Sequence, residues 1–293
     1  MEAVLGWFDE NLVSVLNGIA IGLLLFTMAV GLSLIFGLMD VLNLAHGAIY
    51  LLGSYIAFQF ARDGEAFGLA LAIALGAGVL LGGGLVAAVR PIAGRGHLDQ
   101  ALLTLGIAFV LSDAAAAIWG SDFRSVSSPA FLQGGISVLG SSYPVYRLAV
   151  IVVGIVIAAS VYLVFERTRL GAIVRAAVED RDMVSALGID VTRVMASVLT
   201  AGVALAAFGG VIGAPILNVS PGLDWEVLIL ALIVVVIGGL GSVRGALVGA
   251  LLIGQVQSLG IALFPQLASF ALFGAMALVL LFRPEGLMGD ATS

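Results

Sequence analysis

Long runs of apolar residues, separated by short polar segments, restrict the folds that are open to this chain. Nine such stretches lie at residues 12–36, 48–61, 66–89, 98–119, 147–165, 194–217, 226–243, 246–264 and 266–282. A helix needs about 20 mostly apolar residues to cross the hydrocarbon core of a bilayer, and most of these stretches approach that length. We therefore predict an all-α integral membrane protein, a polytopic bundle of about eight to ten transmembrane helices with nine favoured. Residues 1–293 are expected to form a single transmembrane domain, with the first apolar stretch retained as a span.

The composition agrees with a surface that faces lipid. Charged residues make up 10% of the chain, whereas soluble domains carry about 25%. All 12 basic residues are arginine, so the chain lacks the lysine of a Walker nucleotide site, and any ATP must be hydrolysed on a separate subunit. The net charge of −6 without a basic stripe argues against nucleic-acid binding.

The sequence also shows no grouping of residues that is typical of a metal site or an active site. The chain has no cysteine, and its two histidines, His46 and His97, are far apart in the sequence and lack an accompanying carboxylate cluster. No arrangement of nucleophile, base and acid stands out, so we predict neither a metal site nor catalytic residues. The chain is therefore not expected to be an enzyme, and no cofactor is expected on it.

The arginines predict the orientation of the chain in the membrane. With nine spans and an external N-terminus, nine arginines fall on the cytoplasmic side and three fall outside, as the positive-inside rule favours. The segment of about 166–193 is then a cytoplasmic loop. The segment of about 120–146 is an external loop, and its Ser, Gly and Pro content predicts turns and short strands. This loop either connects two spans or receives a partner.

The cytoplasmic loop is the most polar part of the chain. Its alternating apolar and charged residues predict one helix of about four turns, with Gly188 as the C-terminal cap. The apolar stripe of this helix is expected to contain Ile173, Ala177, Val184 and Leu187. The loop is either a solvated connector or a helix whose apolar side docks into a groove of a partner.

Several polar residues interrupt the apolar stretches and are candidates for the translocation pathway. Asn43 and His46 in VLNLAHGAIYLLGSY are three residues apart and would share a helix face, while Gly47 permits a tight turn. Buried polar groups of this kind either join helices by hydrogen bonds or line a pathway, and both roles stay open for this pair. The other candidates are Asn17 and Gln255, followed by Asp40, Asp113 and Gln257.

The ionisable residues weigh against a transporter driven by protons. A carboxylate near the middle of a span is usual in such proteins, but Asp113 and Glu226 are expected near span ends.

Four motifs, spread in order over the chain, resemble one family. The pattern R-A-x(9)-A-x-G-I, which starts at Arg175, is similar to the coupling loop of bacterial ABC importer permeases. The segments 31–55, 238–260 and 283–289 resemble the LivH-type inner-membrane permease of branched-chain (hydrophobic) amino acid importers. Proteins with these motifs reside, as multi-pass proteins, in the bacterial inner membrane.

The resemblance implies several partners. A homologous LivM-type permease subunit would complete the pathway, two cytoplasmic ATPase subunits would use ATP and magnesium, and a periplasmic protein would deliver the solute. Residues 173–189 would form the helix that docks on the ATPase, with Arg175, Ala176, Ala186, Leu187 and Gly188 as docking candidates. The implied substrates are branched-chain or hydrophobic amino acids. Urea or short amides are the alternative, and a stand-alone secondary transporter or channel is a further one.

Overall fold

The computed structural model describes residues 2–39, 42–92, 95–138 and 141–289. Its long helices are α1 (Glu2–Met39), α2 (His46–Ala61), α3 (Phe67–Val89), α4 (His97–Trp119), α5 (Val145–Arg167), α8 (Val191–Leu217), α9 (Leu223–Gly238), α10 (Val243–Leu263) and α11 (Ala268–Phe282). The shorter elements are α6 (Arg169–Glu179), α7 (Arg181–Ala186), three 3₁₀ turns and the strands β1 (Gly135–Val138) and β2 (Ser141–Pro144). Each of the nine apolar stretches therefore coincides with one helix, and the prediction of a helical membrane protein is confirmed.

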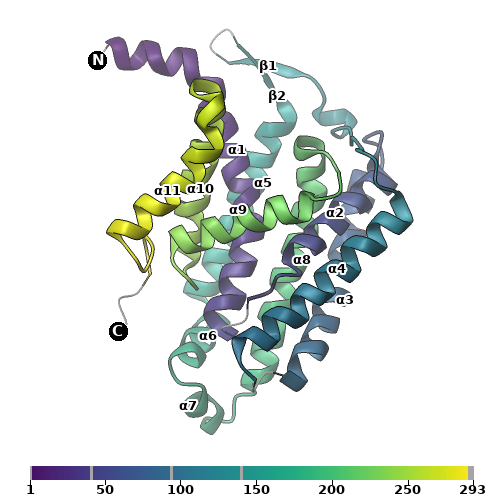
Figure 1. Cartoon of the computed structure of the whole chain (residues 1–293), viewed down its shortest axis with the longest axis vertical. Helices are drawn as coiled ribbons and strands as arrows, with labels where there is room; N and C mark the ends of the chain where they lie inside the picture. Colours follow the sequence, from purple (N-terminus) through teal and green to yellow (C-terminus); the bar gives the residue numbers. More distant parts are fainter. Residues whose placement is uncertain (1, 40–41, 93–94, 139–140, 290–293) are drawn as a thin grey trace.

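Helices α1 and α8 form the centre of the bundle (Figure 1). Their most apolar windows are 83% and 67% buried within the chain. The two helices approach closely at Gly31 and Gly202, where a Cβ atom on Gly31 would lie 2.7 Å from the carbonyl oxygen of Gly202. A second close approach joins α1 to α10, since a Cβ on Gly22 would lie 2.8 Å from the carbonyl oxygen of Ala250. Small residues thus bring the central backbones together, as is typical of membrane bundles.

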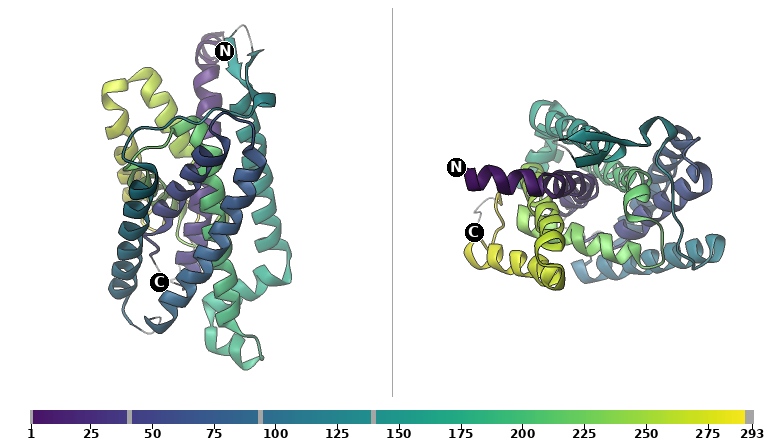
Figure 2. Two further views of the ribbon diagram at one scale, coloured as in Figure 1. Left: turned by 90° about the vertical axis from the view of Figure 1, so that its right-hand side faces the viewer. Right: turned by 90° about the horizontal axis from the view of Figure 1, so that it is seen from above.

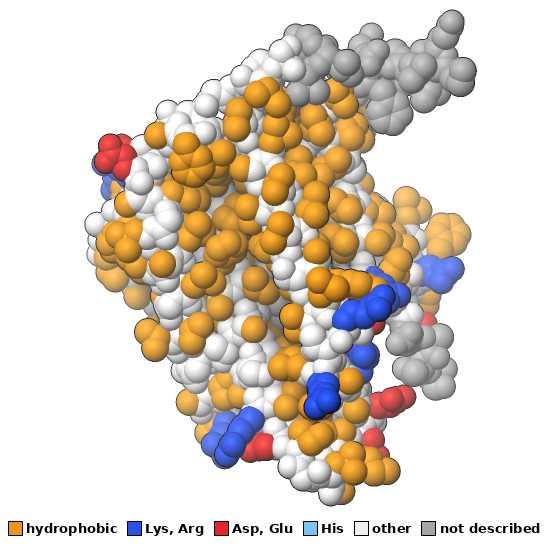
Figure 3. Space-filling view, turned by 180° about the vertical axis from the view of Figure 1, so that it is seen from behind, with side chains coloured by type: hydrophobic (Ala, Val, Ile, Leu, Met, Phe, Trp, Pro, Cys, Tyr) orange, Lys and Arg blue, Asp and Glu red, His pale blue; other side chains and the backbone are white. Residues whose placement is uncertain are grey.

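The outer helices present apolar side chains to their surroundings. Among the described residues, six helices are long and apolar enough to span a bilayer: α1, α3, α4, α5, α8 and α10. Figure 3 shows one outer face, where hydrophobic side chains cover the middle and the charged ones gather below, at the right edge and at one upper corner. This distribution is that of a surface in contact with lipid.

Helices α2 and α9 are shorter than the others, with 16 residues each. A helix of this length measures about 24 Å, less than the roughly 30 Å of the hydrocarbon core. Helix α9 lies across the direction of α1, α5 and α8 (Figure 1), and seen from above it stands in one row with α4 and α11 (Figure 2, right). The segments 42–45 and 218–222, which precede α2 and α9, contain no regular helix.

The two polar loops lie at opposite ends of the molecule (Figure 1). The predicted external loop contains the antiparallel hairpin of β1 and β2, in agreement with the expectation of short strands. The other loop differs from its prediction, because two helices, α6 and α7, replace the single helix of about four turns. The break falls at Asp180, whose backbone is extended and whose side chain accepts a hydrogen bond from the backbone N–H of Met183. Asp180 therefore caps α7 instead of continuing α6.

Candidate functional site

The connection between α1 and α2 is held in place by polar contacts with α4. The hydroxyl of Thr104 donates to the carbonyl oxygen of Leu42 at 3.0 Å and accepts from the backbone N–H of Leu44 at 3.2 Å. The side-chain oxygen of Asn43 accepts from the backbone N–H of Ala45 at 3.2 Å. These contacts satisfy backbone groups that would otherwise lack partners at the break between two helices.

His46 is the first residue of α2 and is fully buried. Its Nε2 atom lies 3.1 Å from the carbonyl oxygen of Met28 in α1, so this nitrogen carries the proton and donates. The side-chain amide nitrogen of Asn43 and Nδ1 of His46 have no hydrogen-bond partner among the described residues. His46 begins α2, but Asn43 lies in the non-helical segment before it, so the prediction that the two residues share a helix face is wrong. The contact with Met28 fixes α2 against the central helix.

Gly47 forms the contact between the starts of α2 and α9. A Cβ atom on Gly47 would overlap the backbone of Asp224 and lie 2.9 Å from Cβ of Leu228, so only glycine fits there. Asp224 is itself buried, and its Oδ2 accepts a hydrogen bond of 2.6 Å from the hydroxyl of Ser112 in α4. The two short helices thus meet at their N-terminal ends, and α4 supports both, through Thr104 and Ser112.

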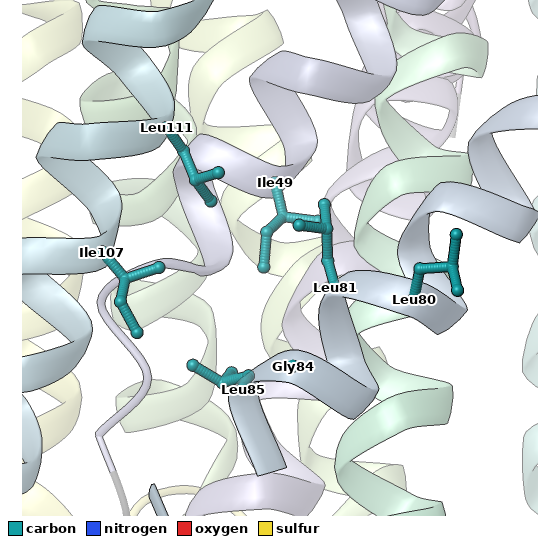
Figure 4. Close-up of a pocket in the computed structure, with 7 residues that line it drawn as sticks. All are labelled: Ile49, Leu80, Leu81, Gly84, Leu85, Ile107 and Leu111. Carbon is teal, nitrogen blue, oxygen red and sulfur yellow. The ribbon is translucent and has the colours of Figure 1, made fainter. Parts of the chain in front are cut away.

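A small apolar cavity of about 150 Å³ lies beside this junction. Ile107 and Leu111 of α4, Ile49 of α2, and Leu81 and Leu85 of α3 surround it (Figure 4). Leu80 and Gly84 complete its lining, which contains no polar side chain. The cavity could accept an aliphatic group but offers no partner to a charged one.

Asn17 and Gln255 lie in another part of the molecule. The side-chain oxygen of Asn17 accepts a hydrogen bond from Arg147 in α5. Gln255 in α10 donates from Nε2 to the carbonyl oxygen of Val15 at 2.9 Å. Both hydrogen bonds connect α1 to neighbouring helices. Asn17 lies roughly 16 Å along the axis of α1 from Met28, which contacts His46. The structure therefore divides the five pathway candidates between two places.

The opposite end of the bundle contains α6 and α7, which form the loop predicted to be cytoplasmic. A hollow of about 900 Å³ is bordered by the end of α1, the end of α5, α6 and the turn before α10. Arg175 in α6 reaches back to donate to the carbonyl oxygen of Phe165 in α5. Arg244 at the start of α10 forms an ion pair of 3.4 Å with Glu166 of α5. Polar contacts thus connect α6 and α10 to the same end of α5.

Helices α6 and α7 expose several apolar side chains. Val178, Met183 and Leu187 are 54%, 60% and 73% exposed. Of the predicted apolar stripe, Ala177 and Val184 are buried, Ile173 is half-buried and Leu187 is exposed. Arg175, Ala176, Ala186 and Gly188 are exposed as well, and Gly188 adopts a positive φ of 81° after α7. The docking candidates therefore lie at the surface, with Gly188 at the helix end as predicted.

Sequence reasoning missed the supporting residues of the junction. Thr104, Ser112 and Asp224 are ordinary residues in apolar stretches, and only the folded chain brings them to the starts of α2 and α9. The spacing of Thr104 and Ser112, eight positions apart in α4, was the available signal. Asp40, which the sequence singled out, lies outside the described residues. The described residues contain no group of three side chains able to hold a metal ion.

These features together define a polytopic helical membrane protein of the transport permease class. The chain belongs to the family of permease components of branched-chain amino acid transport systems, whose model matches residues 14–282. The high-affinity branched-chain amino acid permease BraD of Pseudomonas aeruginosa is 30% identical over 93% of this chain and 94% of its own length. The corresponding LivH protein of Escherichia coli is also 30% identical, over the same shares.

The second permease type of such systems is similar too. The probable LivM permease of Methanocaldococcus jannaschii is 31% identical over 46% of this chain and 44% of its own length. No solved structure matches the fold. The named relatives are transport permease subunits rather than enzymes.

Proposed function

We propose that this chain is one of two membrane subunits of an ATP-driven importer for branched-chain or other hydrophobic amino acids. The second subunit is a LivM-type permease, and the pair lies in the bacterial inner membrane. The chain crosses the membrane nine times with its N-terminus outside, so α6 and α7 are cytoplasmic. Support comes from the family match over most of the chain and from the opposite placement of the two polar loops (Figure 1).

The ATPase subunits dock on α6 and α7. The single observation that carries this role is the exposure of three apolar side chains, Val178 on α6, Met183 on α7 and Leu187 directly after α7, in a segment beyond the spans. Apolar groups in such a position face water unless a partner covers them. Movement of α6 would reach the spans through Arg175 and Phe165, and then through the ion pair of Glu166 with Arg244.

The periplasmic binding protein docks at the other end. The external loop exposes Phe123, Phe131 and Ile136, which are 66%, 83% and 45% accessible. The loop is anchored by two backbone hydrogen bonds between Arg124 and Val219, of 2.7 and 2.8 Å. A fixed loop with exposed aromatic side chains offers a preformed surface for a protein partner.

Uptake by the complete importer tests the function. The chain, the second permease, the ATPases and the binding protein are reconstituted in vesicles, and uptake of radiolabelled leucine, isoleucine and valine is measured with and without ATP. We expect uptake that requires ATP and all subunits. If the importer took up urea or short amides and not these amino acids, the assigned substrate would be wrong. Uptake by the purified chain alone, driven by an ion gradient, would contradict the importer.

The docking surface is tested by a pair of matched variants. Leu187→Glu places a charge on α7 and should greatly reduce the amount of ATPase that co-purifies with the permease. Phe131→Glu changes another exposed apolar residue, at the opposite end of the molecule. It should leave ATPase binding intact and weaken the docking of the binding protein. If both variants retained the ATPase equally, α7 would not be part of the docking surface.

A further inference from the structure

A groove lies between α3 and α4 on the outside of α2. Both helices pack against α2 much more closely than against each other. The apolar cavity of about 150 Å³ occupies this gap, and its residues grade from buried to exposed. Ile49 of α2 and Leu85 of α3 are buried at its base, whereas Leu80 and Gly84 of α3 are exposed at its edge. The cavity therefore opens toward the surroundings of the bundle and not into its core.

The size and the chemistry of the groove suit a single aliphatic chain. Its lining contains no polar side chain, and Ile107 and Leu111 of α4 face Ile49 and Leu85 across the space (Figure 4). A Cβ atom on Gly84 would meet no other atom within 4 Å, so the edge of the groove is open. An α-helix with its side chains is about 10–12 Å wide, which is too large for this volume. An acyl chain fits where a helix does not.

Two arginines lie in the connection between α3 and α4, where the groove ends. This connection is at the same end of the molecule as α6 and α7 (Figure 1). Arg90 directly follows α3, and Arg95 precedes α4 by two residues. Both are exposed, and neither side chain forms an ion pair or a hydrogen bond with another residue that the structure describes. The segment 90–99 contains one acidic residue, Asp99, so a net positive charge remains.

The distance from the arginines to the groove matches the length of an acyl chain in a bilayer. Gly84 precedes Arg90 by six residues, which is about 9 Å along the axis of α3. Ile107 lies ten residues after the start of α4, about 15 Å along that helix. One leaflet of the hydrocarbon core is about 15 Å thick, half of the whole. A lipid whose headgroup lies at the arginines can therefore place a chain in the groove.

We propose that one phospholipid with an anionic headgroup binds between α3 and α4, with an acyl chain in the groove and its phosphate at Arg90 and Arg95. Guanidinium groups form strong charge-assisted hydrogen bonds with phosphate oxygens. Each arginine near an anionic lipid raises the binding constant by a factor of about five. The bound lipid fills the gap between α3 and α4 and fixes their spacing. Because the site uses residues of this chain alone, it does not depend on the transported solute.

Lipid binding to the delipidated permease pair tests the headgroup contact. Native mass spectrometry compares dioleoyl phosphatidylglycerol with dioleoyl phosphatidylcholine, which has the same acyl chains but no net charge. We expect one phosphatidylglycerol per copy of this chain to bind about tenfold or more tightly than phosphatidylcholine. Arg90→Gln together with Arg95→Gln should abolish this preference. Arg167→Gln together with Arg169→Gln, which removes two exposed arginines elsewhere at the same end, should retain it. Equal binding of the two lipids, or equal effects of the two double variants, would overturn the site.

Filling the groove tests the contact with the acyl chain. Gly84→Phe places a ring in the groove and should weaken phosphatidylglycerol binding about tenfold or more, since several methylene groups lose their contacts. Gly83→Phe is the matched control, because Gly83 is equally open but does not line the groove, and it should leave binding unchanged. If both variants bound the lipid as tightly as the unmodified chain, the groove would not hold the acyl chain.

Photocrosslinking distinguishes a lipid from a protein in the groove. A photoreactive phenylalanine analogue replaces Leu80, which is 78% exposed at the edge of the groove, and the assembled permease pair is illuminated in vesicles that contain phosphatidylglycerol. We expect adducts with the lipid. An adduct with the second permease in its place would show that a subunit covers the groove, and would overturn the proposal.

Discussion

Replacing His46 separates the two roles that the sequence leaves open for this side chain. His46 is fully buried, and its Nε2 donates to the carbonyl oxygen of Met28 at 3.1 Å. His46→Ala removes this hydrogen bond, worth about 1 kcal/mol net, and leaves a cavity that adds about 2 kcal/mol or more. We therefore expect a loss of about 3 kcal/mol in the stability of the permease. The loss should loosen α2 from α1 rather than remove a solute contact.

Two further variants divide this loss into its parts. His46→Leu refills much of the volume without a donor, whereas His46→Gln supplies an amide N–H that can reach the same carbonyl oxygen. From most to least stable, we expect the unmodified permease, then His46→Gln, then His46→Leu, and last His46→Ala. The difference between Gln and Leu reports the hydrogen bond to Met28, and the difference between Leu and Ala reports the cavity.

The assay measures the thermal unfolding midpoint of the purified permease pair in detergent, together with uptake per assembled importer. His46→Ala should lower the midpoint by roughly 5–10 °C, and the uptake of each assembled importer should fall little in His46→Gln. If His46→Ala and His46→Gln both abolished uptake at an unchanged midpoint and yield, His46 would contact the solute and the reasoning from burial would be refuted.

Two further predictions concern the junction of α2 with α9 and the helix α7. Gly47→Leu should prevent α2 and α9 from meeting and destabilise the permease by about 3 kcal/mol or more, measured as a lower yield of folded protein. Gly83→Leu, on an open face of α3, is the control and should be tolerated. Asp180→Ala removes the cap of α7 and should cost that helix about 1 kcal/mol, seen as weaker ATPase binding in a pull-down. Asp182→Ala, within α7, should have less effect; equal effects would argue against the cap.

The helices were predictable because their signal is local. An apolar run of about 20 residues indicates a membrane helix whatever surrounds it, and all nine runs coincide with helices. Glycine pairs such as Gly31 and Gly202 were visible as small residues, but the sequence did not reveal which of them face each other. That pairing depends on the tertiary arrangement of helices far apart in the chain.

The candidate site was predictable only in part, for the same reason. The break at Asn43, His46 and Gly47 was indicated by polar residues in an apolar run, and the structure places Asn43 in the non-helical segment before α2 and His46 and Gly47 at the start of that helix. Asp224 was missed because its partner, Ser112, is 112 positions away in the sequence. The interruption at Asp180 did have a local signal, an acidic cap residue, but the regular spacing of apolar residues favoured one continuous helix.

The burial of Asn43 and His46 has a consequence for the route of the solute. Both side chains are fully enclosed within one chain, and the cavity that Ile49 of the same helix α2 lines is small and apolar. An amino acid carries a charged ammonium and a charged carboxylate, and neither group can cross such a region without polar partners. A route through the interior of this single chain is therefore unfavourable at this depth.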